Sequence, residues 1–129
     1  MKSPLQEAYQ FVRSASIKVM GIDNVHEYAK KNYKRFPLAI IGSGQEVTSF
    51  NKSSGQGIVI QDISIYSDNF RNRGTLDRLA TDLKNELVKT NNLKNYTIFI
   101  NNISSVYRVD ESTKTPLPCI NLTVEFRYI

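Results

Sequence analysis

The sequence predicts an α+β domain in which two main helices pack on one face of a mostly antiparallel sheet of four to five strands. The first observation behind this prediction is the length of 129 residues, which suits one domain with its own core. The second is the helical spacing of apolar residues in two segments. The third is the final segment CINLTVEFRYI, 119–129, in which apolar and polar side chains alternate as on a half-buried strand.

The counts of reactive residues exclude several kinds of site. Cys119 is the single cysteine and His26 the single histidine, so an intramolecular disulfide, a cysteine-rich metal site and a two-histidine metal site are excluded. Nothing in the sequence favours a thiolate at Cys119, which we interpret as a small packed side chain. His26 lies among helix-like residues and is interpreted as structural. We therefore expect neither an enzyme nor a bound cofactor.

The sequence also carries expectations about location. The segment MKSPLQEAYQFVRSAS at the start has neither the apolar core nor the cleavage site of a secretory signal. No segment approaches the ~20 apolar residues that a membrane-spanning helix needs. We expect a soluble protein in a reducing compartment.

The first helix is predicted to begin at Pro4 and to end before Gly21. Ser3 is a good N-cap, Pro4 suits the first helical position, and Gln6 completes a capping box. Glycine is a common residue just after a helix. Apolar residues at helical spacing predict one buried face, formed by Leu5, Ala8, Phe11, Val12, Ala15 and Val19.

A second short helix is expected over about 24–32. Its inner face would be formed by Val25, Tyr28 and Ala29. Pro37 ends anything helical, and the segment LAII, 38–41, predicts a short buried strand.

Residues 42–57 are predicted to form a mobile arm. Their glycines, serines and threonines favour flexible ends, and Val47 and Phe50 allow a hairpin in the middle. The start Gly42-Ser43-Gly44 does not continue into a phosphate-binding motif, since Val47 stands where a third glycine would be required. A loop that meets a partner is the interpretation that remains.

Two strands are predicted to change the parity of their apolar positions part-way along. In 58–68 the change falls at Gln61 and Asp62, and in 96–109 it falls at Asn101 and Asn102. This pattern predicts either matched β-bulges or a sheet whose two faces are covered over different halves of its length. In both cases some sheet surface remains for another subunit to cover.

The clearest helix is predicted over about 71–89. Its apolar stripe consists of Leu76, Leu79, Ala80, Leu83 and Leu87. Asp82 and Glu86 lie on the other side and are interpreted as a solvated face. Strands 96–109 and 119–129 then form a hairpin around the polar loop 110–118, whose length favours a contact role.

A basic run, KKNYKRF at 30–36, is a separate candidate surface. Residues 1–57 hold eight basic and four acidic residues, which is +4 of the net charge of +5. Four cations with aromatic rings between them are typical of a segment that follows a nucleic-acid backbone, although cations also suit the solvated end of a helix. The candidate nucleic-acid residues are Lys30, Lys31, Lys34 and Arg35.

The order of these segments resembles the tail terminator, or tail completion, proteins of long-tailed bacteriophages. The likeness rests on FPLAIIG at 36–42, IVIQDISIYSD at 58–68, the helix RGTLDRLATDLKNEL at 73–87 and the aliphatic strand pair that ends the chain. It spans nearly the whole chain.

This resemblance implies a structural role without catalysis. Such subunits close into a ring, typically a hexamer, on the last ring of the tail tube protein, stop tube growth and offer a surface to the head connector. The resemblance implies a location at the head–tail junction of a virion, and in the host cytoplasm during assembly. It also implies that DNA passes through the ring without being bound specifically. A head-closure or connector subunit of the same particle is the alternative. The residues expected to contact partners are Gln45, Glu46, Val47, Phe50 and Lys52 of the arm, and Asp110, Glu111 and Lys114 of the polar loop.

Overall fold

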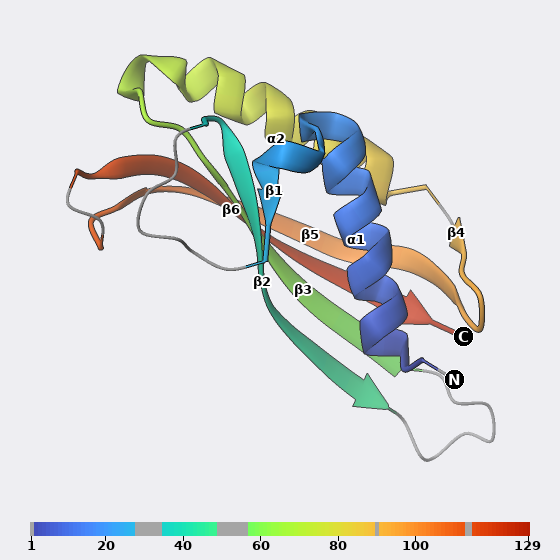
Figure 1. Cartoon of the computed structure of the whole chain (residues 1–129). Helices are drawn as coiled ribbons and strands as arrows, with labels where there is room; N and C mark the ends of the chain where they lie inside the picture. The colour runs from blue at the N-terminus through green and yellow to red at the C-terminus, as the bar shows by residue number, and fades with distance from the viewer. Residues whose placement is uncertain (1, 28–34, 49–56, 90, 113–114) are drawn as a thin grey trace.

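Two helices and one sheet make up the part of the chain that the computed structural model describes, residues 2–27, 35–48, 57–89, 91–112 and 115–129 (Figure 1). The helices are α1 (Pro4–Met20) and α2 (Arg73–Leu87), with 3-10 turns at Ile22–Asn24 and Phe70–Asn72. The strands are β1 (Val25–His26), β2 (Leu38–Thr48), β3 (Gly57–Tyr66), β4 (Asn91–Asn92), β5 (Thr97–Asp110) and β6 (Leu117–Tyr128).

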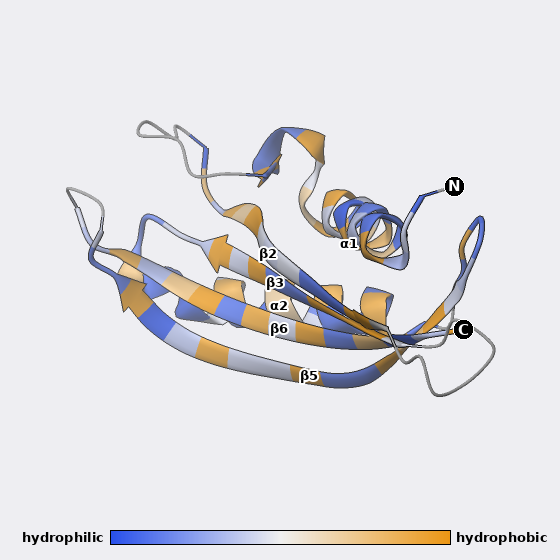
Figure 2. Cartoon of the chain, turned by 90° about the horizontal axis from the view of Figure 1, so that it is seen from below, coloured by the Kyte–Doolittle hydropathy of each residue, from blue (hydrophilic) through white to orange (hydrophobic). Residues whose placement is uncertain are grey.

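The sheet has the order β1-β2-β3-β6-β5-β4. Only the β1–β2 pair is parallel among the described strands. Residues of both helices and of the long strands join one apolar core, and the described chain places no helix on the opposite side of the sheet (Figure 2). The predicted fold class is therefore confirmed, with strands of two residues added at both edges.

Helix α1 begins and ends as predicted. The Ser3 hydroxyl accepts a hydrogen bond from the Gln6 backbone N–H at 3.1 Å, and the chain turns away at Gly21, whose φ of 89° suits glycine. Ala8, Val12 and Ala15 of the predicted face are buried; Leu5, Phe11 and Val19 pack beside them.

The predicted stripe of α2 is also buried. Its five apolar residues, Leu76, Leu79, Ala80, Leu83 and Leu87, are each at most 8% exposed. Strand β6 contributes the facing layer from its even-numbered residues, among them Leu122, Val124 and Phe126.

Within the described residues, no helix is both long and apolar enough to cross a membrane.

The helix predicted over 24–32 is wrong at its start. Asn24 ends a 3-10 turn, and Val25 and His26 form β1, which pairs with Ala39 and Ile40 of β2. Three apolar positions are too few to distinguish a helix from a strand, and pairing with a sheet edge overrides the local preference. Residues 28–34 lie outside the described residues.

The mobile arm is wrong for residues 42–48, because these belong to β2. Gly44 to Thr48 pair with β3 from Gln61 to Gly57, so the predicted hairpin begins here; residues 49–56 lie outside the described residues. A β-bulge lies between Ile41 and Gly44, and a Cβ on Gly44 would come within 2.9 Å of the Gln61 side chain. Gly44 therefore serves close packing.

The two parity changes have different structural causes. In β5 the pairing shifts between Ile100 and Asn102, so Asn101 is the extra residue of a bulge. Strand β3 instead pairs with β6 without a shift from Gly57 to Tyr66. Its buried residues are Val59, Gln61, Ile63 and Ile65. The interruption in the β3 pattern is therefore a buried glutamine, which the sequence alone did not identify.

Candidate functional site

No described helix covers the sheet face opposite the helices, called the outer face below (Figure 2). Residues paired across antiparallel strands point to the same face. The outer face therefore carries the even-numbered residues of β3 from Ile58 to Tyr66, the odd-numbered residues of β6 from Cys119 to Arg127, and their partners on β2 and β5.

Two valines stand out on this face. Val47 of β2 is 50% exposed and Val106 of β5 is 59% exposed. Val47 lies opposite Ile58, and the neighbouring outer-face residue Ile60 is also only half-buried. Val47 therefore forms a small apolar patch with Ile58 and Ile60 at the β2 side of the outer face, a kind of surface that another chain can cover.

The middle of the outer face is polar, and its side chains hold one another. Thr123 donates to Asp62 at 3.0 Å, and the Ser64 hydroxyl donates to Asn121 at 2.6 Å. The Asn101 amide of the β5 bulge donates to Glu125. These cross-strand bonds give the face a fixed pattern of donors and acceptors, as recognition of a partner requires.

A tighter cluster lies at the end of the sheet where β6 begins. Cys119 is fully buried between its strand partners Tyr66 and Arg108. Burial raises the pKa of the Cys119 thiol, and burial together with the nearby Cys119 and Asp110 raises the pKa of Tyr66 to about 12. A protonated, buried thiol is no nucleophile, which agrees with the interpretation of Cys119 as a packed side chain.

The predicted contact residues are distributed between two ends of the sheet. Gln45 and Val47 lie on the outer face near the end of β2, whereas Asp110 ends β5 at the opposite end, followed by the exposed Glu111. The ends are about 30 Å apart, since a strand rises about 3.3 Å per residue. The structure thus does not bring the two groups together. Phe50, Lys52 and Lys114 lie outside the described residues.

Two of these carboxylates have structural partners. Glu46 points to the helix side and accepts a hydrogen bond from the Leu5 backbone N–H at 3.0 Å, so it joins β2 to the first turn of α1. Asp110 accepts from the N–H of Ser112 at 2.9 Å and from its hydroxyl at 2.6 Å. These bonds from Ser112 hold the pKa of Asp110 below its ordinary value.

Of the basic run, only Arg35 among the four predicted residues is described. Its guanidinium is exposed and lies 3.4 Å from the Asp23 carboxylate, a surface ion pair of the kind that contributes little stability. Lys30, Lys31 and Lys34 lie outside the described residues. His26 is half-buried in β1, and within the described ranges no three His, Cys, Asp or Glu side chains are grouped as metal ligands.

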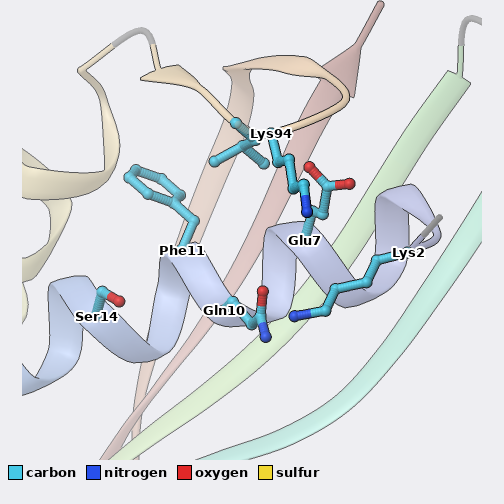
Figure 3. Close-up of a pocket in the computed structure, with 7 residues that line it drawn as sticks. Lys2, Glu7, Gln10, Phe11, Ser14 and Lys94 are labelled. Atoms are coloured by element: carbon cyan, nitrogen blue, oxygen red, sulfur yellow. The ribbon is translucent and has the colours of Figure 1, made fainter.

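A shallow hollow beside α1 contains one buried carboxylate (Figure 3). The hollow has a volume of about 290 Å³, and Lys2 and Lys94 line it with Glu7. Glu7 is 4% exposed and accepts two hydrogen bonds from Asn95, at 2.9 Å from the backbone and at 2.7 Å from the side chain. Burial alone would raise the pKa of Glu7, but the bonds from Asn95 and the nearby lysines lower it. Glu7 is thus part of the structure, joining α1 to the turn before β5.

One of three comparisons with known proteins finds this fold elsewhere. No protein-family model and no curated protein matches the chain. Among solved structures, the chain is similar to one from the "Virion of native gene transfer agent (GTA) particle", with a TM-score of 0.69 at 16% sequence identity. The match covers 98% of this chain and 94% of that one. The two chains therefore share their fold over almost their entire lengths.

Proposed function

We propose that this chain is a structural subunit of a phage-like virion and that it acts as a tail terminator. In this role it closes into a ring, a hexamer in the family that it resembles, on the end of the tail tube. The ring stops the addition of tube protein and offers the surface to which the head joins. The observation that carries the proposal is the similarity in fold, over 98% of this chain, to a chain of a gene transfer agent virion.

The distribution of surfaces supports this role physically. A cap on a polymer needs one surface for the polymer end and a different one for the head, together with contacts between its own copies. Strands β2 and β5, which carry or precede the predicted contact residues, end at opposite ends of the sheet. The open outer face and sheet edges remain for neighbouring copies.

Removal of the protein from the particle that it serves tests the proposal. We expect electron microscopy of particles assembled without this chain to show tubes that exceed their normal length and carry no heads. Tails of normal length detached from heads would instead assign the chain to head closure or head–tail connection. Unchanged, infectious particles would overturn the structural role itself.

The basic run favours one other function, sequence-independent nucleic-acid binding, because Arg35 is exposed and the sequence around it is cationic. Replacement of Lys30, Lys31, Lys34 and Arg35 with alanine separates the two functions. A tail terminator should keep its effect on tube length in this variant. A nucleic-acid-binding protein should lose affinity uniformly across sequences and show a flatter dependence of binding on salt.

A further inference from the structure

Both long edges of the sheet are open in the described chain. Strand β4 covers β5 only at Thr97 and Ile98, and β1 covers β2 only at Ala39 and Ile40. No other described strand pairs with the rest of either edge. Strand β5 has 14 residues and contains neither proline nor lysine, two residues by which proteins commonly protect an edge from pairing.

The register shows which backbone groups of β5 point outward. Ser67 N–H donates to the Pro118 carbonyl, and Thr97 and Ile129 exchange both of their backbone bonds. Because bonded and non-bonded pairs alternate in an antiparallel ladder, even-numbered residues of β6 bond to β3 and odd-numbered residues bond to β5. Beyond the bulge, the outward-pointing residues of β5 are therefore Ile103, Ser105, Tyr107 and Val109.

The same alternation applies to β2 at the other edge. Odd-numbered residues of β3 bond to β6, so the partners of those residues on β2 point their backbone groups away from β3. Beyond the part that β1 covers, they are Ile41, Gly44, Glu46 and Thr48. Each of these two sets has four residues, and β1 and β4 lie at opposite ends of the sheet.

The strand directions make these edges complementary in a head-to-tail arrangement. Four long antiparallel strands, β2, β3, β6 and β5, place edge strands of opposite direction at the two sides of the sheet. A second copy in the same orientation therefore extends the sheet with another antiparallel pair and keeps its helices on the same side. Ile41 and Glu46 of β2 and the four outward residues of β5 have side chains on the helix side, as pairing in one continuous sheet requires.

We infer that β5 of one copy pairs with β2 of the next copy, with Gln45 opposite Val106 and Val47 opposite Ser104. This register sets Gly44 opposite Tyr107. A shift of the next copy toward the β4 end of the seam would bring its β2 against β4 and its β1 against the end of β5, so both short strands limit sliding in that direction. It also brings Val47 and Val106, the two exposed valines of the outer face, into diagonal contact across the seam. This inference rests on the proposed function in one respect: the pairing of β5 with β2 would be the contact that joins copies within the proposed ring.

A pair of cysteines across the seam tests the register. In one copy, positions 45 and 106 are separated by at least three strand spacings, about 14 Å, which is beyond the roughly 7 Å between Cα atoms that a disulfide spans. The double variant Gln45→Cys with Val106→Cys should therefore form bonds only between copies. We expect a non-reducing gel to show a ladder of linked copies whose largest band contains as many copies as the ring.

Matched variants control for register and for oxidation. In the variant Gln45→Cys with Ser104→Cys the second thiol lies two residues along β5 from the position opposite residue 45. This variant should form severalfold fewer links between copies. Asp62→Cys with Thr123→Cys joins two residues that are paired within one copy, so it should form an internal bond and show that oxidation was complete. Equal linking of the two seam variants would overturn the proposed register. Dimers from Val106→Cys alone, in place of the ladder, would overturn head-to-tail pairing.

Two samples of the double variant separate this inference from the proposed function. One is the purified chain at its highest soluble concentration, and the other is the particle purified with the variant in place. Linked rings on tails of normal length support both proposals. Tails of normal length without linked copies, while the internal control bond forms, would overturn the pairing and leave the cap function standing. Linked purified chains would support the pairing even if removal of the protein left tails unchanged.

A proline at the edge supplies a second test that does not depend on cysteines. The N–H of Ser105 points outward, so Ser105→Pro removes one seam hydrogen bond without removing a bond to β6. We expect circular dichroism to show a folded chain that forms several times fewer rings. Ser105→Ala, which removes only the hydroxyl that accepts from Lys84 at 3.0 Å, should form rings normally. Normal ring formation by a folded Ser105→Pro variant would contradict the pairing.

Discussion

Gln61 shows how one buried side chain shapes a neighbouring strand. It is 3% exposed, and its Nε2 donates to the carbonyls of Gly42 at 2.9 Å and of Ser43 at 3.1 Å. We expect Gln61→Leu to lower the free energy of unfolding by about 1–3 kcal/mol, because the bulge carbonyls lose their donor. Urea denaturation measures the change. The exposed Gln45→Leu should stay within about 0.5 kcal/mol of the parent, and an equal loss in both variants would contradict this role.

Glu7 makes the stability of the protein depend on acid. Its pKa in the folded chain is below the ordinary 4.5, so the folded state favours the ionised carboxylate. The resulting stabilisation is fully present above the pKa of the unfolded chain, and is lost as the pH falls through the lower folded pKa. We expect Glu7→Gln to be less stable at pH 7 and to lose less stability than the parent on acidification. Thermal unfolding between pH 7 and pH 3 measures both; parallel curves would contradict the prediction.

At the level of the strand, the β5 bulge keeps two apolar sets on one face. Asn101 is the extra residue, so that Ile100 and Ile103 both face the helices although their numbers differ in parity. We expect a chain lacking Asn101 to fold with nearly normal stability, because the pairing becomes regular. A chain lacking Ser104 should unfold or aggregate, because the deletion moves the side chains of part of β5 to the opposite face of the sheet. Circular dichroism and size-exclusion chromatography distinguish these outcomes, and equal damage from both deletions would argue against the bulge.

The helices were predictable because each repeats one signal many times. Five residues of α2, from Leu76 to Leu87, agree on one buried face, and Ser3 caps α1 as its position predicts. Strand β2 beyond Gly42 was not predictable, because its glycines signal a loop in isolation and Gly44 packs against Gln61 only in the folded chain. The sequence predicts the candidate contact residues only as two segments, the arm and the polar loop. Their separation to two ends of the sheet results from strand pairing, which no local pattern contains.

For the whole molecule, the proposed pairing assigns different surfaces to different contacts. In this pairing the two edges, at β2 and β5, meet copies of the chain, while the two ends of the strands remain free for the tube and head contacts of the proposed function. The two helices pack on the other side of the sheet through the shared apolar core, and Lys18 of α1 is paired to Glu86 of α2 at 3.2 Å. A subunit built in this way can close a ring and still present unlike surfaces above and below it.

One exposed valine tests this division of surfaces. Val47 of the outer face and Val88 after α2 are 50% and 52% exposed, so aspartate at either position should change the free energy of unfolding by at most about 1 kcal/mol. We expect only Val47→Asp to prevent ring formation, because it places a charge at the seam beside Val106. Tails assembled with this variant should be overlong, as without the protein, whereas Val88→Asp should give normal tails. Mass photometry and electron microscopy measure the two effects. If the two variants behave alike, the outer face near Val47 is not where copies of this chain meet.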